Sequence, residues 1–306
     1  MTGDLIALLT TTIALATPLL LAGLGELIGE RAGILNIGVE GLMLVGAFAG
    51  MLGSHASGTP WLGMLAACGA ALLLGALFAV WVVVLDVDQV VAGVAINLLA
   101  AGTTGVLYRA LFGTTGGALT VAAFAPLPIA PGVALLAPLR QPAPVYPALV
   151  LVPLVWVVLF RTRLGLRLRA AGEAPNAAES VGVNVAAIRV GAVLVGAVFA
   201  GAAGGYLSLA YSNTFIEGMS AGRGFIALAI VVFGRWQPLG VLAGSLLFGA
   251  ASAAQFQLQA AGVTIPYHLL LMLPYVLTLL VLAGTSRGAR GPAALAQRRS
   301  LGASAD

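Results

Sequence analysis

Residues 25–50 read GELIGERAGILNIGVEGLMLVGAFAG, and this stretch decides the fold class. Four charged residues interrupt it: Glu26, Glu30, Arg31 and Glu40. The flanking apolar segments are long enough to span a bilayer, where an unpaired charge costs at least ~2.5 to 3.5 kcal/mol. The charges therefore either have a role inside a membrane domain or form a short solvated turn between two spans.

The composition of the whole chain indicates an integral membrane protein. Of its 306 residues, 60% are hydrophobic and 8% are charged, and the mean hydropathy is +1.07. A soluble domain of this composition would expose a very large apolar surface, so soluble classes are excluded. The 41 glycines favour close packing of helices in lipid. Cys68 is the single cysteine, so neither a disulfide framework nor a cysteine metal site is expected.

Apolar windows of ~20 residues define the spans that we expect. They are residues 5–24, 37–52, 61–85, 90–112, 145–160, 190–211, 224–233, 239–256 and 265–283. Segment 224–233 is too short to cross alone unless it is extended or re-entrant. The prediction is an all-α polytopic transmembrane helical bundle of about eight to ten spans, to which the resemblance described below adds a cytoplasmic coupling helix. We expect a transmembrane domain over 1–284 and a flexible basic cytoplasmic tail over 285–306.

The arginines set the expected orientation, because cytoplasmic loops are enriched in positive charge. One group lies in loop 161–189 and another in the tail: Arg161, Arg163, Arg167, Arg169 and Arg189, then Arg287, Arg290, Arg298 and Arg299. Both regions are expected inside, which agrees with the four crossings between them. Counting backwards places the N-terminus and the Pro-rich segment 113–144 outside. The N-terminal stretch has no basic n-region or cleavage site, so we expect a retained span.

Residues 170–185, AAGEAPNAAESVGVNV, predict a short helix at the cytoplasmic surface. Pro175 suits the first turn of such a helix, and Gly182 suits its end. The spacing of Ala177, Ala178 and Gly182 resembles the loop by which permeases of ATP-binding cassette importers dock onto their ATPase subunits. The alternative is an ordinary amphipathic surface helix.

Three segments together carry a wider resemblance. They are ERAGILNIGVEGLMLVGA at 30–47, the loop 170–185, and GRGFIALAIVVFGRWQPLGVLAGSLLFGA at 222–250. They resemble the permeases of bacterial nucleoside and simple-sugar ATP-binding cassette importers, which are relatives of ribose and branched-chain amino acid permeases. The first and third segments are closest to the nucleoside branch. Asn176 stands where the family's docking loop has a leading Glu.

The resemblance implies a complex in the bacterial plasma (inner) membrane. Two permeases, identical or homologous, would join two ATPases and an extracytoplasmic substrate-binding lipoprotein, with membrane lipid around them and no nucleic acid. ATP and Mg²⁺ would belong to the ATPase. A P-loop requires Lys, and this chain has none, so we expect neither a cofactor nor an enzymatic activity here. The residues implied in ATPase coupling are Gly172, Glu173, Ala177, Ala178 and Gly182.

Polar side chains within apolar spans are the candidates for the translocation path, because they normally face the protein interior or a water-filled cavity. Asn36, Glu40 and Asn97 fit this description best. An amide and a carboxylate could meet the ribose hydroxyls and base edges of a nucleoside. Asn97 could equally be an interhelical clasp, and Glu40 could form an ion pair with Arg31.

Outside the spans, Asn213, Glu217 and Arg223 fall at the expected periplasmic mouth, where they either gate the path or are simply solvated. Asp88 is expected to cap the following helix, because a carboxylate favours a helix N-terminus. The two histidines are isolated in sequence and predict no metal site.

Alternative functions separate by substrate and by mechanism. Within the resemblance, ribose-type sugars and branched-chain amino acids are the alternatives to nucleosides. A secondary transporter would show inverted repeats, and no convincing repeat is present. A membrane enzyme would need clustered catalytic groups within the spans, and nothing in the sequence clusters that way.

Overall fold

The structure is a computed structural model that describes residues 2–113, 120–129, 134–260, 272, 276 and 291–297. Within these residues it is helical and has no β-strand beyond an isolated bridge between Pro126 and Pro142. The helices are α1 (Thr2–Arg31), α2 (Val39–Ser57), α3 (Pro60–Ala79), α4 (Gln89–Phe112), α5 (Val145–Arg161), α6 (Arg163–Glu173), α7 (Pro175–Ser180), α8 (Val185–Tyr206), α9 (Arg223–Phe233) and α10 (Pro238–Ala260). The π-helical turns Val80–Val84 and Leu207–Tyr211 extend α3 and α8, and Ala134–Leu139 is a 3-10 helix.

The expected all-α transmembrane bundle is confirmed. In the described part of the chain six helices are long and apolar enough to cross a membrane: Asp4–Arg31, Val39–Ser57, Pro60–Val84, Gln89–Phe112, Val185–Tyr211 and Pro238–Ala260. A seventh span is possible where α5 and α6 meet at a 73° bend. The expected span 224–233 corresponds to α9, which has 11 residues and so is about 16 Å long. The expected span 265–283 lies outside the described residues apart from two isolated positions.

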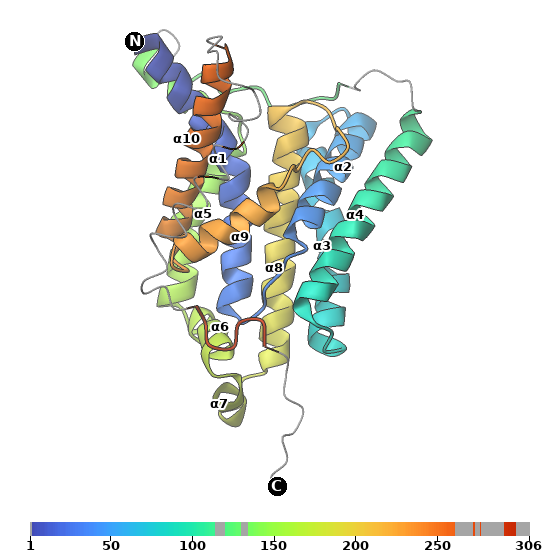
Figure 1. Cartoon of the computed structure of the whole chain (residues 1–306), viewed down its shortest axis with the longest axis vertical. Coiled ribbons are helices and arrows are strands. Elements are labelled where there is room, and N and C mark those ends of the chain that lie inside the picture. Colours follow the sequence, from blue (N-terminus) through green and yellow to red (C-terminus); the bar gives the residue numbers. More distant parts are fainter. Residues whose placement is uncertain are drawn as a thin grey trace.

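Most helices run along the long axis of the bundle (Figure 1), whereas α9 lies obliquely across its middle. The N-terminus lies at one end, and α6 and α7 lie at the other. Gln141, which precedes α5, donates its side-chain amide to the carbonyl of Thr10 at 3.0 Å, which ties segment 134–144 to the N-terminal end. Segment 134–144 and loop 162–184 therefore lie at opposite ends.

Helix boundaries follow local sequence signals. The carboxylate of Asp88 accepts hydrogen bonds from the N–H groups of Val90 and Val91 at 3.0 and 3.1 Å, so the predicted cap is confirmed. Asn184 caps α8 in the same way through the N–H of Ala187 at 2.9 Å. Thr162 separates α5 from α6, and its hydroxyl accepts the N–H of Gly165 at 3.1 Å. The cap at Thr162 thus coincides with the 73° bend.

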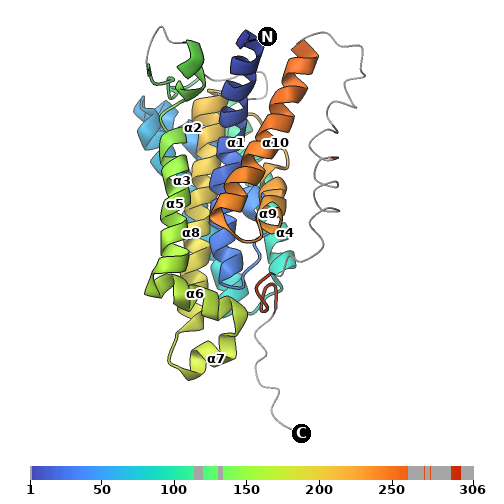
Figure 2. The same cartoon turned by 90° about the vertical axis from the view of Figure 1, so that its left-hand side faces the viewer.

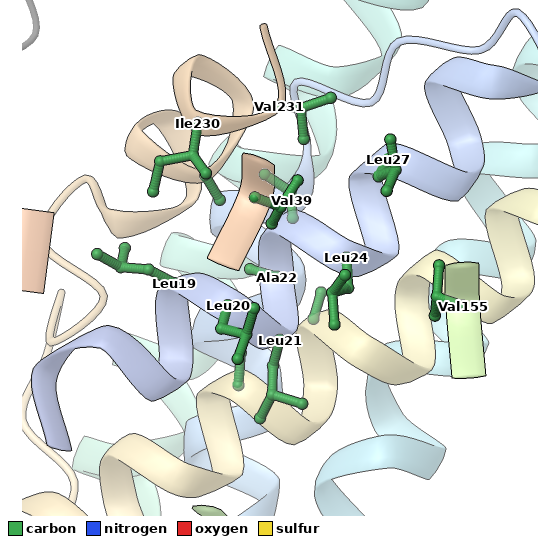
Figure 3. Packing of buried hydrophobic residues seen from close by; sticks show 14 of the residues in the cluster. Leu19, Leu20, Leu21, Ala22, Leu24, Leu27, Val39, Val155, Ile230 and Val231 are labelled. Atoms are coloured by element: carbon green, nitrogen blue, oxygen red, sulfur yellow. The ribbon is translucent and has the colours of Figure 1, made fainter. Parts of the chain in front are cut away.

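The core is centred on α1, which is apolar on all sides. Ala22, Leu24 and Leu27 are completely buried, and Figure 3 shows side chains of α1 meeting Val39 of α2, Val155 of α5 and Ile230 of α9. A helix that is apolar all round is typical of a buried position. Helix α1 therefore lies at the centre of a core against which α5, α8, α9 and α10 pack, whereas α3 and α4 pack against α2.

Helices α2, α3 and α8 approach one another closely at glycines. A Cβ atom at Gly46 of α2 would lie 2.7 Å from the carbonyl oxygen of Gly201 in α8, which is nearer than real Cβ atoms come. Small residues at these positions allow backbone contact where apolar burial no longer drives association. The three helices thus form a tight unit beside α1.

Candidate translocation site

Between α1 and α2 the chain leaves helical structure inside the bundle. Its N–H groups find acceptors: Ile34 donates to the Gly29 carbonyl at 3.0 Å, Leu35 to Gln89 Oε1 at 2.7 Å, and Asn36 to Glu26 Oε1 at 2.8 Å. Non-helical backbone at membrane depth is tolerated only where protein buries it or where it lines a cavity. Because Ile34 is 1% exposed, this connector is a packed element rather than a solvated turn.

Glu40 joins the N-termini of two helices. It lies in the first turn of α2, and its carboxylate accepts hydrogen bonds from the N–H of Gly222 at 2.8 Å and of Gly224 at 2.7 Å, at the start of α9. Helix N-termini carry unpaired N–H donors and partial positive charge, so both ends stabilise the anion. A Cβ at Gly224 would lie 2.6 Å from the Glu40 backbone, so the approach requires glycine.

Asn97 ties α4 to the beginning of α2. Its Oδ1 accepts the N–H of Gly41 at 2.7 Å, and its Nδ2 donates to the carbonyl of Ile37 at 3.0 Å. Asn36 lies nearby, and its Oδ1 accepts the N–H of Gly38 at 3.0 Å. These contacts favour the clasp interpretation of Asn97, and they bring the three predicted path residues to one place, around the start of α2.

The other end of α9 is held by the last turn of α1. Trp236 Nε1 donates to Glu30 Oε2 at 2.5 Å, and the Arg31 guanidinium donates to the Trp236 carbonyl at 2.6 and 3.0 Å. The suggested ion pair between Arg31 and Glu40 is therefore wrong, because the two side chains bind opposite ends of α9. Sequence analysis missed the contact with Trp236, although both partners lie in segments that carried the resemblance.

The predicted outer residues lie on segment 212–222, which precedes α9, and at Arg223, the first residue of α9. Glu217 forms an exposed ion pair with Arg109 of α4 at 3.1 Å. Asn213 has a φ of +56°, and its carbonyl accepts the N–H of Val121 at 3.2 Å. Arg223 donates to the carbonyls of Met219 and Ser220 at 2.9 and 3.2 Å. The contacts of Glu217 and Asn213 connect the segment before α9 to α4 and to segment 120–129.

The predicted coupling region forms two helices instead of one. Pro175 begins α7 as expected, and Gly182 follows it with a φ of +84°, a conformation that favours glycine. In between, Ala177 is exposed whereas Ala178 is buried. Helix α7 thus presents one of the two alanines to the outside.

Gly172 and Glu173 end α6 and contact the bundle. Gly172 is buried against the backbone of Arg31 and Gly33, and its carbonyl accepts the N–H of Ala294 at 2.9 Å. Glu173 Oε2 accepts the N–H of Ala293 at 3.2 Å. The end of α6 therefore packs directly against the last turn of α1, which contacts Trp236.

Residues 8–282 match the protein family described as the branched-chain amino acid transport system, permease component. The chain belongs to this family. It is a permease subunit of a transport system and not an enzyme. Membership implies an ATPase and a substrate-binding protein as partners. Among the residues that the structure describes, no group of three or more His, Cys, Asp or Glu side chains could hold a metal ion.

Several named proteins are similar to this permease. The guanosine ABC transporter permease NupQ of Bacillus subtilis is 35% identical over 92% of this chain and 93% of its own length. The nucleoside ABC transporter permease NupC of Lactococcus lactis is 37% identical over 88% of each chain. The "putative glucose ABC transporter permease protein TsgC13" of Haloferax volcanii is 41% identical over 83% of this chain and 78% of its own. No solved structure matches the chain.

Proposed function

We propose that this permease moves nucleosides into the cell, driven by a separate ATPase subunit and supplied by an extracytoplasmic binding lipoprotein. The observation that carries the proposal is the similarity to two nucleoside permeases, which extends over 88–93% of each chain. The polar cluster around Glu40 gives this function a physical location. Nucleosides are neutral and rich in hydrogen-bonding groups, so they need polar partners on the way but no counter-charge.

Glu40 and Asn36 supply the chemistry for such a path, and Asn97 holds the start of α2 in place beside them. A ribose hydroxyl can donate to the Glu40 carboxylate, and the N–H groups of Gly222 and Gly224 can donate to a hydroxyl or a base edge. In the structure these groups satisfy one another. Passage of a substrate would therefore exchange internal hydrogen bonds for bonds to the substrate, which keeps the contact weak enough for release.

A sugar is the second candidate substrate. The TsgC13 protein, whose printed name refers to glucose, has the higher identity of 41%, although over a smaller share of the chain. Sugars and the ribose of nucleosides present the same hydroxyl groups, so the Glu40 cluster fits both classes. The base is what distinguishes a nucleoside, and a substrate comparison must therefore include both.

The remaining parts of the path follow the same proposal. Helix α7, which contains Ala177, and the following Gly182 dock on the ATPase at the cytoplasmic face. Gly172 and Glu173 transmit the movement of α7 to α1. The N-terminus then lies on the outer side of the plasma membrane and the C-terminus on the cytoplasmic side. Asn213, Glu217 and Arg223 lie at the outer mouth, and a second permease, identical or homologous, completes the pathway.

Uptake of labelled substrates tests the proposal. Cells with and without the gene are offered guanosine, adenosine, uridine, ribose, glucose and leucine in parallel at micromolar concentration. Loss of nucleoside uptake alone is the expected result. Loss of glucose or ribose uptake with nucleoside uptake intact would overturn the nucleoside assignment in favour of the sugar candidate.

A further inference from the structure

An apolar groove lies on the outside of the bundle between α5 and α8. Its volume is about 380 Å³, within the range of ~300 to 1,000 Å³ that is typical of ligand pockets. Side chains of α1, α5, α6 and α8 line it, among them Ile28, Leu151, Val158, Leu168, Ile188 and Phe199. All fourteen lining residues are apolar. Such a groove accepts a hydrocarbon chain rather than a polar solute.

Helix α6 indicates where the groove meets the membrane surface. It turns by 73° away from α5 and lies beneath α5, beside the lower end of α8 (Figure 2). Leu164 and Leu166 are 56% and 61% exposed, and they lie between the exposed Arg163 and Arg167. A helix with this pattern lies in the plane of the interface, with its arginines at headgroup level. Leu164 also lines the groove, so the groove extends from the interface into the membrane.

The corner between α5 and α6 carries positive charge without internal neutralisation. In the described part of the chain no carboxylate forms an ion pair with Arg161, Arg163 or Arg167. The Arg161 guanidinium lies 5.3 Å from the centre of the Trp156 ring, and Trp is typical of the membrane interface. Arg163 and Arg167 are four residues apart on one helix, so they face the same side.

We propose that this groove binds one acyl chain of an anionic phospholipid, whose phosphate is held by Arg161, Arg163 and Arg167. Guanidinium groups bind phosphate oxygens in pairs, and basic clusters beside transmembrane helices select anionic headgroups. The length of the groove suits the tail of such a lipid, because α5 lines it from Leu151 to Leu159, about 12 Å of helix. The proposal is independent of the transported substrate, and the orientation proposed above decides only which leaflet supplies the lipid.

Gly191 of α8 offers a way to close the groove. It lines the groove, and a Cβ built on it meets no atom within 4 Å, so a larger side chain fits without a backbone clash. Gly102 of α4 is the matched control, because it is equally open and also lies on an apolar transmembrane helix. The Gly191→Phe and Gly102→Phe variants therefore differ in whether they fill the groove.

The test is native mass spectrometry of the full-length protein, purified in mild detergent and given phosphatidylglycerol or phosphatidylcholine. Wild type and Gly102→Phe should each retain one phosphatidylglycerol, in preference to phosphatidylcholine by at least about tenfold. Gly191→Phe should lose both lipids. A triple variant with Arg161, Arg163 and Arg167 changed to Gln should still bind lipid but lose the preference for phosphatidylglycerol.

Two results would overturn the proposal. One is equal retention of both lipids by the wild type. The other is unchanged phosphatidylglycerol retention in Gly191→Phe. If light scattering also shows that this variant dissociates a permease pair, the groove is assigned to a second permease copy. Should Gly191→Phe not fold, the triple Arg→Gln variant decides, since an unaltered preference for phosphatidylglycerol in that protein also contradicts the proposal.

Discussion

The carboxylate of Glu40 accepts a hydrogen bond from the backbone N–H of Gly224 at 2.7 Å, across 184 residues of sequence. The bond joins the first turn of α2 to the first turn of α9, so two helix N-termini share one anion within the bundle. The opposite end of α9 is held by Glu30 and Arg31. The segment from Glu30 to Glu40 thus contacts both ends of the short helix α9.

Replacing Gly224 with Ala should disturb this junction. The new Cβ would lie 2.6 Å from the Glu40 backbone, so the helices must move apart, at a cost of ~1 to 3 kcal/mol. We expect a lower thermal midpoint of the purified protein and reduced uptake. Gly69→Ala is the control, because a Cβ there meets nothing within 4 Å and should leave the midpoint unchanged or slightly raised. Equal thermal midpoints for the two variants would show that the contact between Gly224 and the Glu40 backbone tolerates an added Cβ atom.

Asn97→Ala should act on stability more than on substrate selection. It removes the two hydrogen bonds that link α4 to Gly41 and Ile37, worth roughly 0.5 to 1.5 kcal/mol each. The thermal midpoint should therefore fall, while the substrate concentration for half-maximal uptake stays unchanged. A rise of that concentration at an unaltered midpoint would assign Asn97 to the path and not to a clasp.

The contact of Trp236 with Glu30 can be isolated by a double-mutant cycle. Trp236→Phe leaves a buried carboxylate oxygen without its donor, which should cost ~1 to 3 kcal/mol. Glu30→Gln keeps an acceptor for the indole and should cost less. Trp156→Phe is the control for the loss of an indole ring, because the Trp156 ring lies against the Arg161 guanidinium and not against Glu30. Because Glu30→Gln can still accept the indole N–H, the cycle uses Glu30→Leu, and additive effects of Trp236→Phe and Glu30→Leu on unfolding would mean that the contact contributes nothing.

The exposed side of α7 should bind the ATPase. Val181, directly after α7, is 78% exposed, the highest exposed fraction of any large hydrophobic residue that the structure describes. Val181→Asp should abolish co-purification of the ATPase while the permease still reaches the membrane. Ser57→Asp, a change at an exposed position near the opposite end of the bundle, should not. If the ATPase still co-purifies with Val181→Asp, the docking surface lies elsewhere on the permease.

Much of the fold could be predicted from composition and periodicity, because apolar length decides which segments span a membrane. Helices α1 to α4, α8 and α10 correspond to expected spans for this reason. The short apolar window 224–233 predicted α9, but the sequence did not predict the contacts that hold the two ends of this helix. Contacts such as Glu40 with Gly222 and Glu30 with Trp236 join residues about 180 to 206 positions apart, and no local pattern encodes such pairs. The division of the coupling region into α6 and α7 falls at Ala174, whose backbone is not helical and which lies directly before Pro175, as is usual for a residue that precedes proline.

The most direct test of the account is guanosine uptake by cells that carry Glu40→Ala or Glu40→Gln, normalised to the amount of permease in the membrane. Loss of the carboxylate removes two charge-assisted hydrogen bonds, each worth roughly 1.5 to 3 kcal/mol. Glu40→Ala should reduce uptake by at least about tenfold, and Glu40→Gln should be intermediate. Ser57→Ala, a change at an exposed position at the end of α2, should change uptake little. Normal guanosine uptake by Glu40→Ala would contradict the claim that the Glu40 cluster lies on the nucleoside path.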